Sequence, residues 1–154
     1  KPVMPDQFSR VPFVALIEQI VGQYNHHQVS VELENKLPEE VACLANQDQL
    51  YSTIKHVVQN AVESIEGEGR VSIELTPGQR GHIQVIISDN GKGMTQEFIA
   101  DGLFRPFEST KGVSGMGVGV YQSREYLRSL NGDIDVRSEV GVGSCFTLTL
   151  PIII

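Results

Sequence analysis

One stretch of helical periodicity, placed between stretches of strand periodicity, constrains the fold of this chain most. From Gln47 to about Ile65, apolar residues recur every three or four positions and fall on one face of a helix. Before this stretch, Val29, Val31 and Leu33 alternate with polar residues, as in a half-buried strand. A helix of this kind buries its apolar face by packing across a sheet.

The rest of the chain repeats these two patterns. Helical periodicity predicts two further helices, one over residues 13–24 with Pro12 at its first turn and one over residues 117–130 with Gly132 just past its end. Alternation predicts strands over 29–33, 41–45, 71–75, 83–87, 134–136 and 146–150. We therefore predict an α+β fold, a two-layer α/β sandwich whose mixed, mostly antiparallel sheet is covered on one face by helices.

Length and composition exclude several classes of protein. The 154 residues suit one domain, 1–154, and the net charge of −7 has the wrong sign for a protein that wraps nucleic acid. No apolar run approaches the roughly 20 residues of a membrane span. Cys43 and Cys145 have neither metal-ligand spacing nor a disulfide framework, which favours a reducing cytoplasm. The chain begins with Lys1 and lacks a signal pattern, so we expect a domain of a longer protein.

Glycine is concentrated in one part of the chain. Seven of the fifteen glycines lie between Gly91 and Gly119, where the backbone must approach something closely or take a positive φ. Residues 88–131 hold five basic and five acidic side chains, so this part is neutral within an acidic chain. An anionic ligand would be tolerated best here, although loops also collect glycine for other reasons.

Two glycine motifs lie in this region. Asp89-Asn90-Gly91-Lys92-Gly93-Met94 follows a predicted strand, and its carboxylate can accept a hydrogen bond from an amino group on a planar ring such as adenine. Gly115-Met116-Gly117-Val118-Gly119 leads into a predicted helix, where backbone N–H groups can converge on a phosphate. The alternatives are a plain β-turn for the first motif and close helix packing for the second.

Three further segments are candidates for the same chemistry. In Leu103 to Lys111, Phe104 and Phe107 can pin the base of a mobile lid while Lys111 reaches phosphate oxygens, or the phenylalanines can be core. On the long helix, Asn60 can complete the shell of Mg²⁺, although a solvated Asn would give the same pattern. Gly141 to Phe146 is a turn that feeds the last strand.

The order and spacing of these segments resemble those of a known family. From Asn60 to Gly141-x-Gly-Ser they resemble the N, G1, F, G2 and G3 boxes of the ATP-binding catalytic domain of bacterial sensor histidine kinases, within the Bergerat-fold (GHKL) group that includes gyrase, Hsp90 and MutL. The resemblance spans about residues 8–151, and Leu103 to Tyr126 resembles in particular the sensor kinase of PEP-CTERM exopolysaccharide systems.

The resemblance implies a role for each matching residue. Asn60 would bind Mg²⁺, Asp89 would read the adenine amino group, and Lys111 would contact phosphates, with Asn60 and Lys111 acting in catalysis. Glu108 to Ser114 would form an ATP lid. The complete set implied to hold Mg-ATP is Asn60, Glu63, Ser64, Asp89, Gly91, Lys92, Gly93, Met94, Phe104, Phe107, Thr110, Lys111, Gly112, Gly115, Met116, Gly117, Val118, Gly119, Ser144 and Phe146.

Two positions depart from the family pattern. Bergerat-fold ATPases that hydrolyse ATP carry a glutamate four residues before the N-box Asn, where this chain has His56, so transfer is favoured over hydrolysis. Glu63 stands where many kinases carry Lys or Arg.

The alternatives to a histidine kinase are an ATPase that drives a conformational cycle, an anti-sigma-type serine kinase and a nucleotide-sensing module without catalysis.

The resemblance also implies partners. The phosphorylated histidine of the family sits on a separate helical dimerisation domain, and the contexts of His26, His27, His56 and His82 do not match it. We expect this dimerisation domain and a response regulator as partners, no nucleic acid, and a homodimeric full-length protein. The domain would be cytoplasmic, and the full-length protein could be anchored in the inner membrane.

Overall fold

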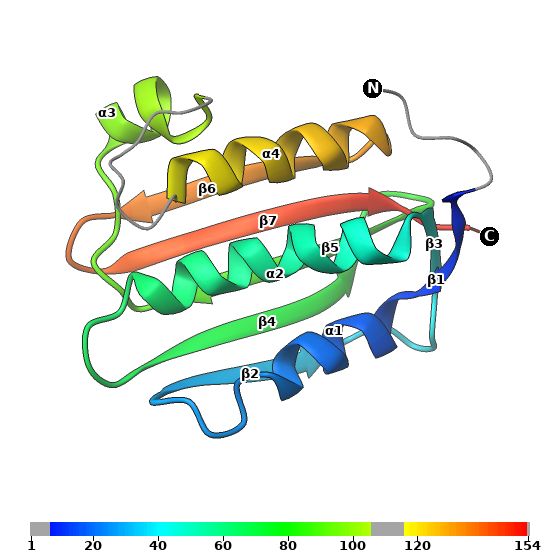
Figure 1. Ribbon diagram of the computed structural model, residues 1–154, viewed down its shortest axis with the longest axis horizontal. Helices are drawn as coiled ribbons and strands as arrows, with labels where there is room; N and C mark the ends of the chain where they lie inside the picture. The colour runs from blue at the N-terminus through cyan, green and yellow to red at the C-terminus, as the bar shows by residue number, and fades with distance from the viewer. Residues whose placement is uncertain (1–6, 106–115, 154) are drawn as a thin grey trace.

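The computed structural model describes residues 7–105 and 116–153, with the side chains of 116–119 left aside. A five-stranded sheet lies behind three helices that cover one of its faces (Figure 1). The elements in chain order are β1 (Ser9–Pro12), α1 (Phe13–Gly22), β2 (Val29–Asn35), β3 (Ala42–Ala45), α2 (Gln47–Glu63), β4 (Gly69–Pro77), β5 (His82–Asp89), α3 (Gln96–Phe98), η2 (Ile99–Leu103), α4 (Met116–Ser129), β6 (Asp133–Glu139) and β7 (Gly143–Pro151).

The sheet is mixed and mostly antiparallel, as predicted. Its strand order is β2-β4-β5-β7-β6, in which only the β2–β4 pair is parallel. A parallel pair needs a crossover connection, and the chain between β2 and β4 supplies it with β3 and α2. This crossover places α2 over the middle of the sheet.

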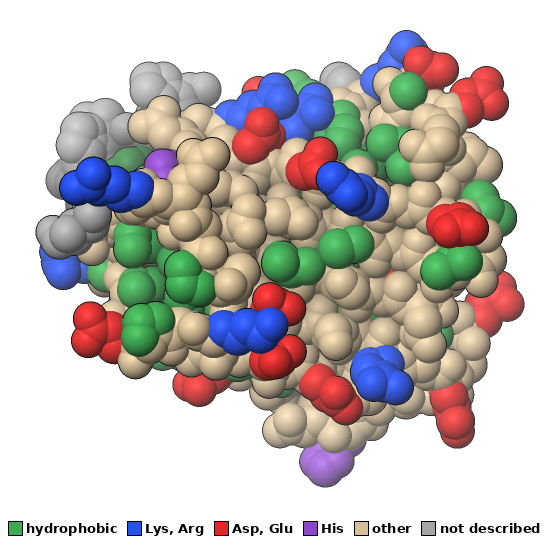
Figure 2. All heavy atoms as spheres, turned by 180° about the vertical axis from the view of Figure 1, so that it is seen from behind, with side chains coloured by type: hydrophobic (Ala, Val, Ile, Leu, Met, Phe, Trp, Pro, Cys, Tyr) green, Lys and Arg blue, Asp and Glu red, His purple; other side chains and the backbone are tan. Residues whose placement is uncertain are grey.

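The core lies between the helices and the covered face of the sheet. Alternate residues of neighbouring strands share this face in register, so that Ile87 lies between Ile73 of β4 and Phe146 of β7. All three are buried, and each contributes roughly 1.5–3 kcal/mol through burial of its side chain. The opposite face carries scattered charged side chains (Figure 2), in agreement with the exposed Glu32 and Glu34 of β2.

Strand β1 and the π-helix η2 were not expected from the sequence. Strand β1 pairs antiparallel with β3, and a bridge between Ala42 and Ile153 ties the C-terminal end to this small ribbon. Strand β1 is four residues long and ends at Pro12, so its pattern is too short to stand out. Pro12 is also the N-cap of α1, one residue before the helix begins.

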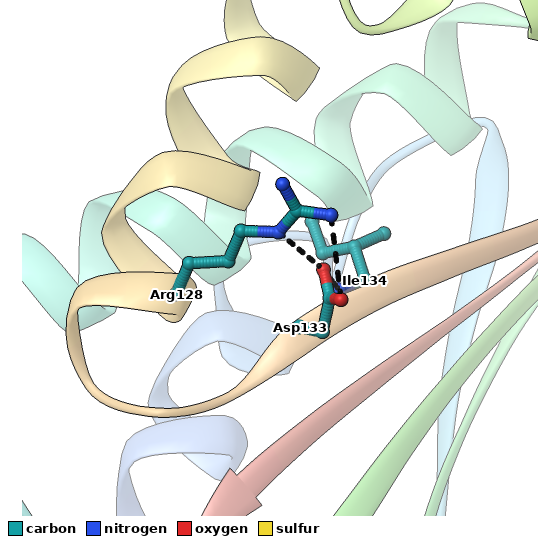
Figure 3. A network of polar contacts seen from close by, with 3 residues as sticks. All are labelled: Arg128, Asp133 and Ile134. Atoms are coloured by element: carbon teal, nitrogen blue, oxygen red, sulfur yellow. Dashed lines mark hydrogen bonds and ion pairs between the residues drawn. The ribbon is translucent and has the colours of Figure 1, made fainter.

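Helix α4 ends in a motif that fixes the following turn. The Asn131 N–H donates to the carbonyl oxygen of Arg128 at 3.0 Å, and the Gly132 N–H donates to that of Leu127 at 2.8 Å. Asn131 takes the positive φ of +67°, so this residue, rather than Gly132, supplies the left-handed conformation. Across the turn, the Arg128 guanidinium pairs with the Asp133 carboxylate, whose Oδ1 also accepts from the Ile134 N–H (Figure 3).

Helix α1 lacks a cap from its own N-cap residue because Pro12 has no side-chain hydrogen-bonding group. Glu40, which is distant in sequence, supplies the cap. Its Oε1 accepts from the Val14 N–H at 2.7 Å, and its Oε2 accepts from the Ala15 N–H at 3.1 Å. A carboxylate here satisfies two free donors and faces the positive end of the helix dipole.

Replacement of Glu40 by alanine therefore removes the cap of α1. We expect Glu40→Ala to lower the free energy of unfolding by about 1 kcal/mol, the usual effect of losing a helix cap. Urea unfolding measures this difference. The control is Glu39→Ala, because Glu39 is exposed next to Glu40 and caps no helix among the described residues. Equal stability of the two variants would contradict the role of Glu40.

Candidate functional site

The end of strand β5 puts a carboxylate where the buried apolar face of the strand ends. Ile83, Val85 and Ile87 lie on the helix-covered face, and Asp89 is the next residue on that face. The register places Asp89 opposite Ser144 of β7. A charged group therefore lies at the edge of the core, between the sheet and the helices.

Hydrogen bonds from a helix end and from a loop hold the Asp89 carboxylate. Its Oδ1 accepts from the Gly91 N–H at 2.9 Å and from the Ser64 hydroxyl at 3.1 Å. Ser64 is the C-cap of α2, and its hydroxyl also lies 2.7 Å from the carbonyl oxygen of Ala61. The end of α2 and the end of β5 are thus joined through one carboxylate oxygen.

Burial raises the pKa of Asp89 above its ordinary value of 3.8. Hydrogen bonds from the Gly91 backbone, the Ser64 hydroxyl and the Ser144 backbone oppose this rise, but the loss of hydration is the larger effect. A carboxylate that is partly stripped of water has a strong demand for a further donor. An amino group on a planar ligand would satisfy this demand.

Two glycines allow the backbone to approach the site closely. A Cβ atom on Gly91 would lie 2.1 Å from the Ser64 hydroxyl oxygen and 2.6 Å from the Ser64 carbonyl oxygen. Gly93 has a φ of +74°, and a Cβ there would lie 2.1 Å from the carbonyl oxygen of Glu139. Between them, Lys92 is held at both ends: its N–H donates to Ser64, and its carbonyl oxygen accepts from Gly141. Both glycines therefore fix the loop against α2 and against the β6–β7 turn.

Ser138 links the loop to strand β7, and the sequence did not single it out. Its hydroxyl oxygen accepts from the Met94 N–H at 2.7 Å and lies 2.8 Å from the hydroxyl oxygen of Ser144. It also donates to the Gly143 carbonyl oxygen at 2.9 Å. Ser138 and Ser144 are register partners in the β6–β7 hairpin. Their contact follows from this strand pairing and not from a local motif. Phe146, two residues along β7, is buried beside Ile87.

Asn60 lies in the C-terminal half of α2 and is only 8% exposed. Its Nδ2 is buried and has no hydrogen-bond partner among the described residues. Leaving a buried polar group unpaired costs about 1–3 kcal/mol, which a bound ligand would recover. A half turn of the amide exchanges its oxygen and nitrogen, so this position can present an oxygen to a hard metal ion.

Two other polar residues of α2, Glu63 and His56, have surroundings that differ from those of Asn60. Glu63 is exposed, and its Oε2 accepts from Gln59, which accepts from the Tyr24 hydroxyl at 2.6 Å. This chain of contacts leads to α1, and burial together with nearby Glu63 raises the pKa of Tyr24. His56 is exposed and lines a cavity of about 340 Å³ between α2 and α4. His56, Asn60 and Glu63 thus have different surroundings, although they lie on one stripe of the helix.

Helices α2 and α4 run antiparallel, which brings the start of α4 beside the end of α2 (Figure 1). The Ser123 hydroxyl donates to the carbonyl oxygen of Thr53, and the Asn46 N–H donates to the hydroxyl oxygen of Tyr126. Later residues of α4 therefore contact earlier residues of α2. The first turn of α4 consequently lies on the side of Asn60 and Ser64.

Part of the predicted site lies outside the described residues. Phe107, Thr110, Lys111, Gly112 and Gly115 all fall there, as does the predicted lid from Glu108 to Ser114. Met116, Gly117, Val118 and Gly119 form the first turn of α4, where the structure describes the backbone alone. Phe104 is half-buried, and the guanidinium carbon of Arg124 lies 3.9 Å from the centre of its ring.

Among the described residues, no group of three or more His, Cys, Asp or Glu side chains could hold a metal ion. The described residues do bring together Asp89, Ser64 and the Gly91–Gly93 loop, with Ser144 opposite Asp89. This combination suits a flat ring with an amino edge, placed next to the end of α2.

A family profile matches most of the chain. The family is described as "Histidine kinase-, DNA gyrase B-, and HSP90-like ATPase", and the match covers residues 45–154. The chain belongs to this family. The matched range contains Asn60, Asp89, the glycine loops and Ser144, so the resemblance inferred from the motifs is confirmed at the level of the family.

One relative of this chain is a histidine-protein kinase. The signal transduction histidine-protein kinase AtoS of Escherichia coli (strain K12) is 31% identical over 149 residues, which make up 95% of this chain and 24% of AtoS. This chain therefore spans about a quarter of that relative.

Solved structures show that the fold is that of histidine kinase catalytic domains. Full-length ShkA in complex with AMPPNP matches with a TM-score of 0.79 and 20% identity, over 94% of this chain and 31% of ShkA. ThkA in complex with the response regulator TrrA matches with a TM-score of 0.74 and 18% identity, over 94% of this chain and 41% of that one. The predicted two-layer Bergerat-type sandwich is confirmed. The narrower resemblance of Leu103 to Tyr126 to PEP-CTERM kinases stays a prediction.

The raised pKa of Asp89 predicts a pH dependence of stability. Because the folded state holds the Asp89 proton more tightly than the unfolded state, the ionised carboxylate destabilises the fold at pH values above its raised pKa. We expect Asp89→Asn to be more stable than the wild type at neutral pH, since the amide oxygen still accepts from Ser64 and Gly91. This gain shrinks as the pH falls through the raised pKa and the wild type becomes protonated.

Urea unfolding of both proteins between pH 4 and 8 measures this difference. Asp135→Asn, at an exposed position of β6, is the matched control and should show no such gain. A variant Asp89→Asn that is less stable than the wild type at neutral pH would contradict the account.

Proposed function

We propose that this chain, residues 1–154, is the ATP-binding catalytic domain of a sensor histidine kinase. In the proposal this domain is part of a longer protein. In this proposal it binds Mg-ATP and donates the γ-phosphate to a histidine on a separate dimerisation domain. The family match and the relative AtoS, a histidine-protein kinase, support the proposal. The observation that carries it is the half-buried Asp89 carboxylate, held by Ser64 and Gly91 at the end of β5.

Asp89 would recognise the base. Its carboxylate accepts a hydrogen bond from the adenine amino group, and the restricted loop of Gly91 and Gly93 lies beside the ring. Met94 is packed partly against the core, and its backbone is held by Ser138, so the loop is fixed before the ligand arrives. A fixed acceptor costs little to organise on binding. Lys92, Ser144 and Phe146 complete this side of the proposed site.

Asn60 would hold the metal ion. Its buried Nδ2 has no hydrogen-bond partner among the described residues. Mg²⁺ takes few protein ligands when phosphates and water supply the others. Bound Mg²⁺ would neutralise charge on the phosphates. The first turn of α4, with Gly115 to Gly119 and Lys111 before it, would supply N–H groups and a positive charge to the phosphates.

The surroundings of His56 favour transfer over hydrolysis. In members that hydrolyse ATP, the equivalent helix position carries a glutamate that activates water. His56 is exposed and lines a cavity with Asp48, Ser52 and Gln122. No carboxylate stands four residues before Asn60 to act as a base on water. The acceptor in our proposal is therefore a protein side chain.

The proposed partners are the dimerisation domain of the same protein and a response regulator. ThkA has been solved with the response regulator TrrA, and its fold is shared over 94% of this chain. We further propose a homodimeric full-length protein. Among the described residues, no helix is both long and apolar enough to cross a membrane. A membrane anchor and a cytoplasmic location for this domain remain part of the proposal.

The fate of the γ-phosphate tests the proposal. The domain is mixed with ATP labelled on the γ-phosphate, Mg²⁺ and the dimerisation segment of the parent protein. We expect an acid-labile, base-stable label on that segment. Free phosphate without labelled protein would favour the ATPase, an acid-stable label would favour a serine kinase, and neither product despite ATP binding would favour a sensing module.

In the same assay, Asp89→Asn should lose most of the label. We expect its ATP affinity to fall by at least about 1.5 kcal/mol, because an amide in either orientation is a weaker acceptor than a half-buried carboxylate. Calorimetric titration measures this change. Asp135→Asn makes the same chemical change on an exposed part of β6 and should bind ATP like the wild type. Unchanged ATP affinity of Asp89→Asn would remove Asp89 from the site.

A further inference from the structure

Arg124 is the least explained charged residue of α4. Its guanidinium carbon lies 3.9 Å from the centre of the Phe104 ring, which is the geometry of a cation–π contact. The Nε of Arg124 is buried and has no hydrogen-bond partner among the described residues. Burying this atom is costly without a compensating contact, and the Phe104 ring supplies one.

Phe104 belongs to a segment that is itself anchored. It directly follows the π-helix η2, whose last residue, Leu103, is fully buried in the core. Phe104 also packs partly against that core. π-helices are rare and are frequently found at functional sites. Arg124 therefore connects α4 to a well-packed segment at the far side of the fold from α1.

The other side of α4 is attached to α2. Ser123 donates to Thr53, and Tyr126 contacts Asn46. Since consecutive helix residues differ by about 100° in direction, Ser123 and Arg124 face different neighbours. Helix α4 is thus held between α2 on one flank and η2 on the other, and Arg124 makes the second attachment.

We propose that Arg124 is a positioning residue for the phosphate end of the nucleotide. This inference rests on the proposed function. The Arg124–Phe104 contact sets the position of α4, and with it the first turn from Met116, relative to η2. Small displacements of a binding group weaken its interactions strongly. The hydrogen bonds around Asp89 come from Ser64 and the Gly91 loop and do not involve this pair, so recognition of the base is independent of it.

The proposal predicts different effects on the phosphate end and on the base end of the nucleotide. Arg124→Met keeps the length and packing of the side chain but removes its charge. We expect this variant to bind ATP about tenfold more weakly, because the first turn of α4 loses its fixed position, while its affinity for adenosine stays unchanged. Arg124→Lys should recover part of the ATP affinity. Phe104→Leu should reproduce the loss, and the double variant should add little to it.

Arg128→Met is the matched control. Arg128 lies one turn later on α4 and pairs with Asp133 across an exposed turn, so ATP affinity should not change. Titrations with ATP and adenosine measure the affinities, and thermal unfolding checks that each variant folds. An Arg124→Met variant with wild-type ATP affinity would overturn the inference, as would an equal loss of ATP and adenosine.

Two further results have separate meanings. If Phe104→Leu binds ATP normally while Arg124→Met does not, Arg124 acts directly on the ligand and its positioning role is overturned. If the wild type binds no ATP at all, the proposed function fails, and the inference that rests on it is overturned as well. Wild-type ATP affinity of Arg124→Met overturns the inference alone. Failure of the function and failure of this inference are therefore distinguishable.

Discussion

The partial burial of the Asp89 carboxylate is the constraint on which the site depends. Strand β5 carries apolar residues on its covered face up to Ile87, and Asp89 follows on the same face at the edge of the core. Its Oδ1 is held by Ser64 from α2 and by the Gly91 backbone, so one group joins helix, strand and loop. The fold tolerates a carboxylate with a raised pKa at this point because these donors replace part of the lost water.

The same packing that forms the core places the phosphate end of the proposed site. Helix α2 lies across the sheet because the parallel β2–β4 pair needs a crossover, and α4 lies antiparallel to it. The end of α2, with Asn60, and the start of α4 therefore lie together (Figure 1). The proposed site thus lies where α2 and β5 end and α4 begins, a place where backbone groups and side chains are free to contact a ligand.

Much of the fold could be predicted from the sequence because its apolar periodicity is regular. The helix at 47–65 and the strands at 71–75 and 83–87 were predicted close to their observed bounds. Contacts between distant residues could not be predicted in this way. The Glu40 cap of α1, the hydrogen bond of Ser138 to Met94 and the Arg124–Phe104 contact depend on tertiary packing, which periodicity does not encode. Asp89 could be proposed from the sequence because its motif is local.

The central claim is that Asp89 recognises the amino group of adenine, and the ligand itself can test it. Inosine triphosphate has the same phosphates and ribose as ATP but an oxygen in place of that amino group. This oxygen would face the half-buried Asp89 carboxylate. Titration of the wild-type chain with both nucleotides in the presence of Mg²⁺ measures the discrimination. The account predicts that ATP binds at least about tenfold more tightly, because the analogue supplies no amino group to the carboxylate. Equal affinities for the two nucleotides would contradict it.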